Sequence, residues 1–187
     1  MYYKAQYQPQ EFEVLSLGQR KLSPYAHILY VKKGHILLRL GKEELFLTPG
    51  SCFYIPFDCL FQITALQGCH LDRVLLSPRL KSQTKIYPQG TGKLESPFLL
   101  EVLDKLSQSF SPIVNEKMKH LLDVVLDELA SLRPITCKAP LKISPEIQSQ
   151  LKCRQVIRCV KSGKKLDKLL NQDPSLKTLL AQYTDLI

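Results

Sequence analysis

The stretch from Tyr25 to Leu76 constrains the fold of this chain more than any other part of it. It consists of short apolar runs rich in β-branched and aromatic residues, each followed within a few positions by glycine, proline or aspartate. The runs are Leu29–Val31, Ile36–Leu40, Leu45–Leu47, Cys52–Ile55, Phe61–Ala65 and Leu71–Leu76. Short runs separated by closely spaced turn residues are typical of an antiparallel sandwich or barrel and not of helices.

Two segments within this stretch resemble the motifs of a known fold. Thr48 to Pro56 reads TPGSCFYIP and is similar to the second signature motif of cupin barrels, and Leu29 to Gly34 is similar to the pattern that precedes it. More closely, residues 20–80 resemble the N-terminal sensor domain of AraC-family transcription regulators. This resemblance implies an α+β fold that opens with a cupin-like antiparallel β-barrel (a double-stranded β-helix) over residues 1–92, the effector-sensing domain.

The same resemblance bears on metal binding. Metal-bearing cupins hold their ion with two His and a Glu in the first motif and a further His in the second. Aligned on Gly34 and Gly50, this chain has His27 at the Glu position and Phe61 at the position of the last His, and positions 20–23 contain no His. A single His does not hold zinc or iron by itself. The resemblance therefore implies an apolar pocket without metal or cofactor and argues against an enzyme.

The metal-ligand positions of cupins point into the barrel, so His27 and Phe61 are expected to face inward. Leu29, Val31 and Ile63 have the same strand parity and should join them. Four further polar side chains are candidates for ligand contacts if they face inward. The candidate effector-binding residues are thus His27, Tyr30, Arg39, Tyr54, Phe61 and Arg73. A sugar, an aromatic acid or a fatty acid would suit such a pocket, and an arginine at its mouth would favour an acid.

Two amphipathic helices are predicted after the β-rich part, over residues 93–133. Ser96-Pro97 suits the start of the first, with serine as N-cap and proline at the first helical position. The second has an apolar stripe at helical spacing: Met118, Leu121, Leu122, Val125, Leu126 and Leu129. Such a stripe packs either on the chain's own barrel or on a second copy. Because AraC-type sensors follow their barrel with a helical pair, and several dimerise through it, the resemblance implies a homodimer.

The remaining residues are predicted to form a linker and a further helical segment. Residues 134–145 contain Pro134 and Pro140 and suit a linker. Ser144-Pro145-Glu146 predicts the start of a helix that Ser162-Gly163 should end, with a short helix following from Leu166 to Leu170. Asp173 to Ala181 resembles the opening of the AraC-type helix-turn-helix region. Residues 146–187 would then be the start of that DNA-binding domain, without its recognition helix.

Charge and cysteine content indicate which partners and which cellular compartment suit the chain. Residues 141–187 hold nine Lys or Arg and four Asp or Glu, a net charge of +5 out of +9 for the whole chain. This excess suits nucleic acid as a partner, or a solvated helix face. We expect neither a signal peptide nor a membrane-spanning run, and hence a cytoplasmic protein. The six cysteines are scattered without a C-x-x-C pair, as in cytosolic proteins with free thiols.

Taken together, these features are typical of the effector-sensing and dimerisation part of an AraC-type, bacterial transcription regulator. The resemblance implies DNA and RNA polymerase as partners of the full-length protein, a homodimer, and a small-molecule effector or a regulatory protein as input, with no membrane. Two alternatives remain. One is a cupin-fold enzyme, such as an isomerase or a dioxygenase, and the other is a cupin regulator gated by a protein partner.

Overall fold

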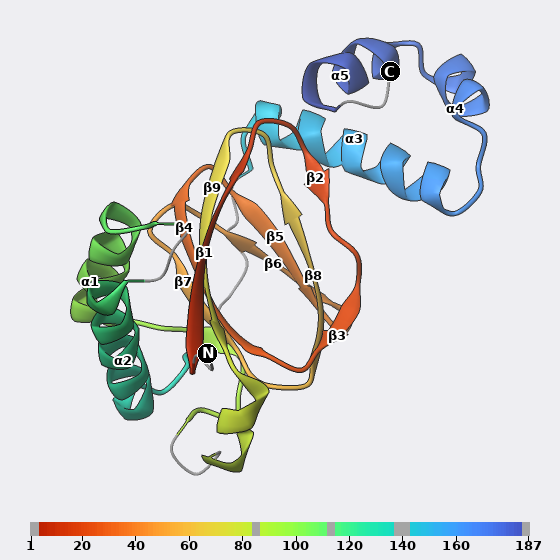
Figure 1. The fold of residues 1–187 in the computed structure, drawn as a ribbon. Helices are drawn as coiled ribbons and strands as arrows, with labels where there is room; N and C mark the ends of the chain where they lie inside the picture. The colour runs from red at the N-terminus through yellow and green to blue at the C-terminus, as the bar shows by residue number, and fades with distance from the viewer. Residues whose placement is uncertain (1–3, 84–86, 112–114, 137–142, 185–187) are drawn as a thin grey trace.

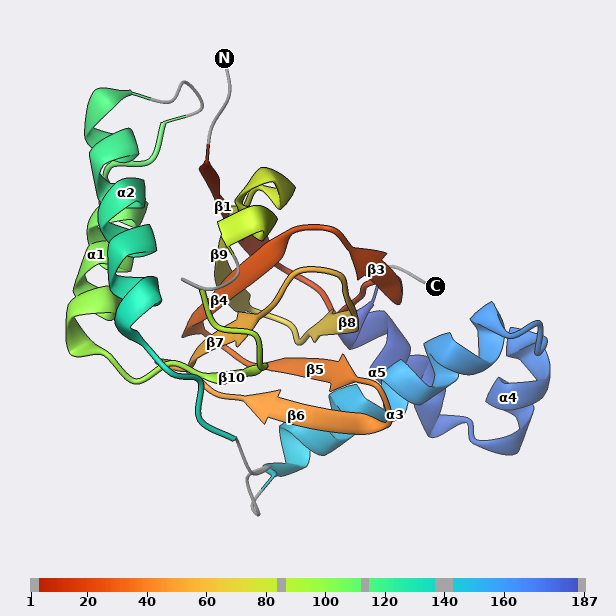
Figure 2. The same ribbon diagram turned by 90° about the horizontal axis from the view of Figure 1, so that it is seen from below.

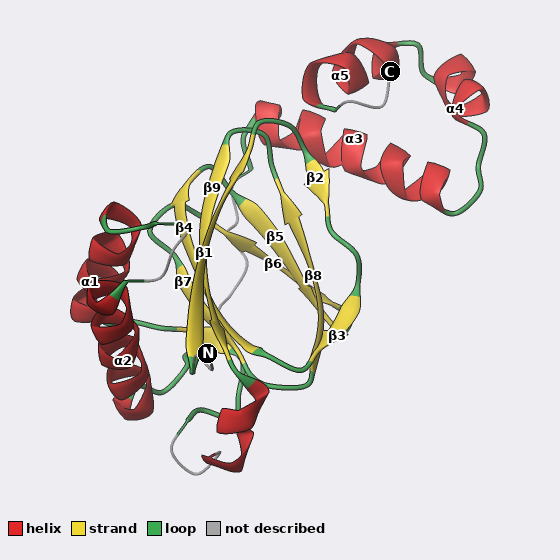
Figure 3. Cartoon of the chain, viewed as in Figure 1, coloured by secondary structure: helices red, strands yellow, loops and turns green. Residues whose placement is uncertain are grey.

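The computed structural model describes residues 4–83, 87–111, 115–136 and 143–184, and its strands precede its helices (Figure 1). Figure 3 shows the separation of strands from helices. The strands are β1 (Ala5–Phe12), β2 (Ser16–Leu17), β3 (Lys21–Ser23), β4 (Ala26–Lys33), β5 (Ile36–Leu40), β6 (Glu43–Leu47), β7 (Cys52–Ile55), β8 (Cys59–Ala65), β9 (Cys69–Leu76) and β10 (Gly92–Lys93). A short 3-10 helix follows β9 at Pro78–Gln83, and the helices are α1 (Pro97–Gln108), α2 (Glu116–Ser131), α3 (Pro145–Lys161), α4 (Leu166–Gln172) and α5 (Ser175–Tyr183).

The strands form two antiparallel sheets. Sheet A has the order β1-β9-β4-β7-β10, and sheet B has the order β2-β8-β5-β6, with β3 also paired to β8. The predicted α+β class and antiparallel pairing are confirmed, but the predicted closed barrel is not. In the described ranges no strand of one sheet pairs with a strand of the other. β2 and β3 are too short to form a long ladder, and edge strand β1 contains Pro9, which has no N–H to donate.

The space between the two sheets is filled by one apolar core. Alternate residues of each strand point into it, because successive side chains of a strand face opposite sides. Sheet A contributes Leu29, Val31, Phe53, Ile55, Cys69 and Leu71, and sheet B contributes Ile36, Leu38, Leu45, Leu47, Phe61 and Ala65. Ile63 packs against this cluster, as predicted from its parity.

The outer face of sheet A is covered by the helical pair α1 and α2 (Figure 2). Ser96 caps α1 as predicted, its hydroxyl accepting a hydrogen bond from the Leu99 N–H at 3.0 Å. The stripe proposed for dimerisation lies in this layer. Met118, Leu122, Val125, Leu126 and Leu129 are buried in it, and Leu121 is partly buried against it. Since the chain's own sheet already covers these side chains, dimerisation through them stays a prediction.

The outer face of sheet B carries α3 and α5, and α4 packs on these two helices away from the sheets (Figure 1). Their apolar side chains join Leu15, Leu37, Phe46 and Leu66 in a third cluster. The predicted helix start and end are confirmed, with Ser144 capping α3 and Gly163 adopting φ +94° just beyond it. The segment predicted as an incomplete helix-turn-helix therefore packs on the sheets. Part of the predicted linker, residues 137–142, lies outside the described residues, as does Cys137.

None of the helices in the described part of the chain is long and apolar enough to cross a membrane.

Candidate ligand-binding site

A cavity of about 330 Å³ lies at one end of the space between the two sheets. Exposed residues of the β2–β3 connection and of β3 form part of its wall, and inward-facing residues of β4, β8 and β9 form the rest. Its lining consists of Gly18, Gln19, Lys21, His27, Phe61, Ile63 and Arg73. The apolar core ends here and cationic side chains begin, so a bound molecule would contact both.

His27 is held in one orientation by its neighbours. Its side chain is only 5% exposed, and its Nε2 lies 2.7 Å from Ser23 Oγ. The ring of Phe61 meets the imidazole edge-on at 5.0 Å between centroids. Ser23 Oγ also accepts from the Tyr25 N–H and donates to the Tyr25 carbonyl, both at 3.3 Å. The tautomer of the imidazole decides whether Nε2 donates to Ser23 or accepts from it, and with it whether Nδ1 is an acceptor or a donor.

The imidazole of His27 is neutral at physiological pH. Burial, followed by the positive charges of Arg73 and Lys21, lowers its pKa from 6.5 to about 4. In the tautomer in which Nε2 accepts from Ser23, Nδ1 of this neutral ring is a hydrogen-bond donor. Nδ1 is buried and has no hydrogen-bond partner among the described residues.

Arg73 supplies a second donor without a partner. One of its terminal nitrogens, Nη2, lies 3.4 Å from Gln8 Oε1, whereas its Nε is buried without a hydrogen-bond partner in the described ranges. Burial also lowers the pKa of this guanidinium. None of the described residues that line the cavity is Asp or Glu. Because an unsatisfied buried donor is costly, Arg73 Nε, together with His27 Nδ1 in its donor tautomer, favours a ligand that brings acceptors and negative charge.

Three of the six candidate effector-binding residues come together in this cavity: His27, Phe61 and Arg73. The other three lie elsewhere. Tyr30 and Tyr54 belong to the cluster between sheet A and the helical pair, one position out of phase with inward-facing neighbours such as Leu29 and Phe53.

Arg39 is also outside the cavity. It lies between Leu38 and Leu40, which pack inward, and it is the strand partner of Glu44 and Gln62 on the outer face of sheet B. Strand alternation thus corrects the expectation that Tyr30, Tyr54 and Arg39 line the pocket.

Sequence reasoning also missed part of the lining, namely Gly18, Gln19 and Lys21. The available signal was the cupin alignment itself. It places the first two metal ligands within positions 20–23, which include Lys21, so it could have indicated side chains of this part of the chain near His27 even though none is a histidine. The exposed, short β3 gives no periodic pattern of its own.

The residues present do not fit the metal that the cupin fold implies. Within the part of the chain that the structure describes, no group of three or more His, Cys, Asp or Glu side chains could hold an ion. His27 Nε2 is engaged by Ser23, and the other charged groups of the cavity, Arg73 and Lys21, are cations that would repel a metal.

No protein-family model and no curated protein match this chain. Solved structures similar to it are cupins. One is a cupin superfamily protein from Desulfitobacterium hafniense, with 10% identity over 41% of this chain and 70% of that chain at a TM-score of 0.38. Another is KdgF from Halomonas sp., with 24% identity over 44% and 77% of the two chains at a TM-score of 0.38.

A third similar structure corrects the prediction that this chain is not an enzyme. It is a salicylate 1,2-dioxygenase from Pseudoaminobacter salicylatoxidans, 14% identical over 43% of this chain and 22% of that chain at a TM-score of 0.39. Solved structures similar to this chain therefore include an enzyme, and the prediction that this chain is not an enzyme is wrong.

Proposed function

We propose that this chain binds a small organic carboxylate between its two sheets. The observation that carries this proposal is the pair of buried, unpartnered nitrogens, Arg73 Nε and His27 Nδ1, in side chains that line one cavity, where none of the described lining residues is acidic. A carboxylate would select the tautomer in which His27 Nδ1 donates. A carboxylate offers acceptor oxygens and the opposite charge, and its hydrogen bonds with a guanidinium are among the stronger ones in proteins.

The size and walls of the cavity narrow the ligand class further. A volume of about 330 Å³ is at the lower end of the range for small-molecule sites. Phe61 and Ile63 offer apolar contact opposite the cationic side chains. A sugar, which presents many hydroxyl donors, finds no carboxylate acceptor here. A single-ring or short-chain monocarboxylate suits the cavity best.

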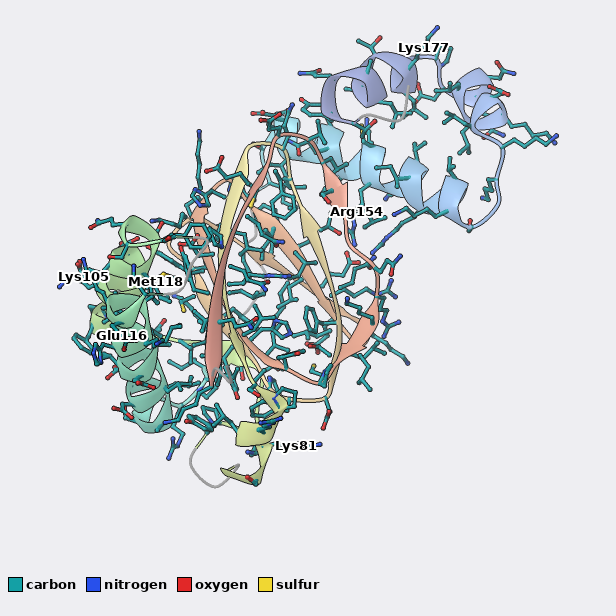
Figure 4. All side chains as sticks on the ribbon, in the orientation of Figure 1. Lys81, Lys105, Glu116, Met118, Arg154 and Lys177 are labelled. Atoms are coloured by element: carbon teal, nitrogen blue, oxygen red, sulfur yellow. The ribbon has the colours of Figure 1, made fainter. Side chains whose placement is uncertain are left out.

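Carboxylate binding fits the role of the effector-sensing part of an AraC-type transcription regulator. Two observations support this role: the cationic residues gathered on α3–α5, and a helix over Ser175–Tyr183 where the resemblance expects the helix-turn-helix to begin. Figure 4 shows Lys177 of this region pointing away from the sheets. DNA, RNA polymerase and a second copy of the chain are the partners that this role entails.

Calorimetric titration tests the ligand proposal, with benzoate and hexanoate as probes and benzamide as a neutral match in shape. We expect one of the acids to bind and benzamide to bind at least about tenfold more weakly, because charge-assisted hydrogen bonds contribute about 1.5–3 kcal/mol each.

The matched variants are Arg73→Gln and Arg39→Gln, since only Arg73 lines the cavity. Arg73→Gln should weaken acid binding about tenfold or more, and Arg39→Gln should leave it unchanged. Failure of both acids to bind, or an equal loss in the two variants, would contradict the proposal.

Acid–base catalysis without a metal is a second candidate function, favoured by the 2.7 Å contact between Ser23 Oγ and His27 Nε2. A neutral imidazole joined to a hydroxyl can move a proton beside a bound acid. Deuterium uptake from D2O at the carbon next to the carboxylate of mandelate would reveal such a reaction. It should disappear in His27→Gln, and a wild-type protein that promotes no uptake would reject this candidate.

A further inference from the structure

The wall of the cavity formed by the β2–β3 connection lies between the candidate ligand and helix α3. Gly18 and Gln19 line the cavity, and the preceding residue, Leu17, offers its carbonyl to Lys161 Nζ of α3 at 3.3 Å. One short segment therefore has the ligand space on one side and the C-terminal helices on the other.

The side chain of Gln62 in β8 holds this wall of the cavity in place by hydrogen bonds. Its Nε2 donates to the Gly18 carbonyl at 2.7 Å, and its Oε1 accepts from Arg158 Nη2 of α3 at 3.4 Å. Gln62 lies between Phe61 and Ile63, which face the cavity, so its own side chain is on the outer face of sheet B. A single amide side chain thus joins the cavity wall to α3.

Backbone packing prevents the wall of the cavity from moving closer to β8. The Gly18 N–H donates to the Ile63 carbonyl at 3.0 Å, and a Cβ on Gly18 would lie 2.7 Å from that same oxygen. Gly18 is therefore pressed against β8, and a displacement of the wall by a ligand must act on the contacts with Gln62 and Leu17.

Arg158 is in turn held by a charged cluster on sheet B. Its Nη2 donates to Glu44 Oε1 at 2.9 Å, and Arg154 contacts both carboxylate oxygens of Glu44. These hydrogen bonds, those of Arg154 first, lower the pKa of Glu44 to about 2. Figure 4 shows Arg154 on the side of α3 that faces the sheets. The position of Arg158 over Gln62 is therefore fixed by α3 docking.

We infer that α3 holds the wall of the ligand cavity through Gln62, so that ligand binding and the docking of α3 on sheet B are coupled. The inference rests on the proposed carboxylate site. Gln62 and Arg158 are positioning residues, since neither lines the cavity. Coupling between two equilibria is reciprocal, so the factor by which docked α3 strengthens ligand binding is the factor by which ligand strengthens docking.

The test compares two variants of the whole chain, Gln62→Met and Gln150→Met. Both remove an amide at the contact of α3 with the strands: Gln62 joins α3 to sheet B, and Gln150 joins it to the turn between β8 and β9. Gln150 accepts from the Gln67 N–H at 2.8 Å and does not line the cavity. Its substitution therefore affects the docking of α3 at a place remote from the cavity wall. Circular dichroism and the Tm establish that each variant is folded.

Amide hydrogen exchange in ligand-free protein gives the first readout. Exchange at Gly18 and Gln19 should accelerate in Gln62→Met and not in Gln150→Met. Unchanged exchange at Gly18 in Gln62→Met would overturn the inference, whatever the ligand result.

Benzoate affinity gives the second readout. We expect it to fall about threefold to tenfold in Gln62→Met, the loss typical of one hydrogen bond, and less than twofold in Gln150→Met. Benzoate should also slow exchange over the last turn of α3 in the wild type but not in Gln62→Met.

The two proposals fail in different ways. If no probe acid binds the wild type while the exchange difference is present, the ligand function and its coupling are rejected and the hold of α3 on the wall remains. If benzoate binds but slows no α3 amide, the coupling alone is rejected.

Discussion

The two outer faces of the sandwich are covered by helices in different ways. On sheet A, α1 and α2 bury long apolar stripes against Ile28, Tyr54 and neighbouring side chains in one cluster that continues into the sheet. On sheet B, α3 and α5 bury fewer apolar residues, and the Arg154–Glu44–Arg158 cluster and the amide of Gln62 complete the contact. Apolar burial is nearly indifferent to pH and salt, whereas charge pairs are sensitive to both. The first face is therefore permanent, and the second can respond to conditions.

A matched pair of core truncations gives the largest expected effect on this comparison. Leu129 of α2 and Leu180 of α5 both have 0% exposure. Leu129→Ala should lower the free energy of unfolding of the whole sandwich by about 2–5 kcal/mol. Leu180→Ala should release α3–α5 locally and change the unfolding of the sandwich by less than about 1 kcal/mol. Urea denaturation combined with amide exchange by element measures both, and equal global losses would contradict the comparison.

The next largest effect is the pH dependence of stability that we expect from His27, which lies between the two sheets. Its pKa is about 4 in the folded chain against 6.5 when unfolded, so the unfolded chain binds more protons between these values. The free energy of unfolding should therefore fall as pH drops from about 6.5 to about 4, by on the order of 3 kcal/mol.

Urea titrations at several pH values measure this slope. His27→Gln should remove it. A slope that persists in that variant would assign the pH dependence to another group.

A substitution at Glu44 tests the charged contact between α3 and sheet B alone. Its pKa is lowered from 4.5 to about 2, so its contribution to α3 docking is present above pH 4.5 and is lost as pH falls toward 2. At pH 7, Glu44→Gln should weaken α3 docking by about 1 kcal/mol and leave α1 and α2 unchanged.

Exchange rates of α3 amides report this loss. The adjacent Glu43→Gln is the control, because the described residues show no ion pair or hydrogen bond to the Glu43 side chain. Similar acceleration in both variants would count against the Glu44 cluster.

Salt should have the smallest effect. Raising NaCl to about 1 M shortens the screening length to about 3 Å, which weakens partly exposed pairs. We expect the free energy of α3 docking to weaken by a few tenths of a kcal/mol and the packing of α1 and α2 to stay unchanged. Amide exchange at low and high salt measures the difference, and faster exchange throughout α2 would contradict it.

The sequence predicts the helices and strands well where a strong period meets a cap. The stripe of α2 and the caps Ser96 and Ser144 lie where they were expected. Asp58, in the turn between β7 and β8, adopts φ +53°, because aspartate tolerates that region better than most residues. These features are local, and local chemistry determines them.

The candidate site was only half predictable, because it depends on which way each strand faces. The alignment with the metal-ligand positions of cupins placed His27 and Phe61 together, whereas strand parity relative to Leu29 and Phe53 places Tyr30 and Tyr54 on the opposite face of sheet A. Gln62 could not be anticipated, since its role requires α3, almost a hundred positions away, to lie on the same sheet. The strand pattern does not reveal which edge strands pair, so it did not predict that, in the described ranges, the two sheets have no strand pairing between them.

The backbone contact between Leu15 and Tyr183 has a consequence for synthesis of the chain. The Leu15 N–H, near the beginning, donates to the Tyr183 carbonyl at 2.8 Å, near the end. On the ribosome the strands and the helical pair emerge long before α5, so they can pack while Leu15 still lacks this partner. Docking of α3 and α5 on sheet B then follows the packing of the sandwich, and a nascent chain stalled before α5 would expose the Leu15, Leu37 and Phe46 patch to chaperones.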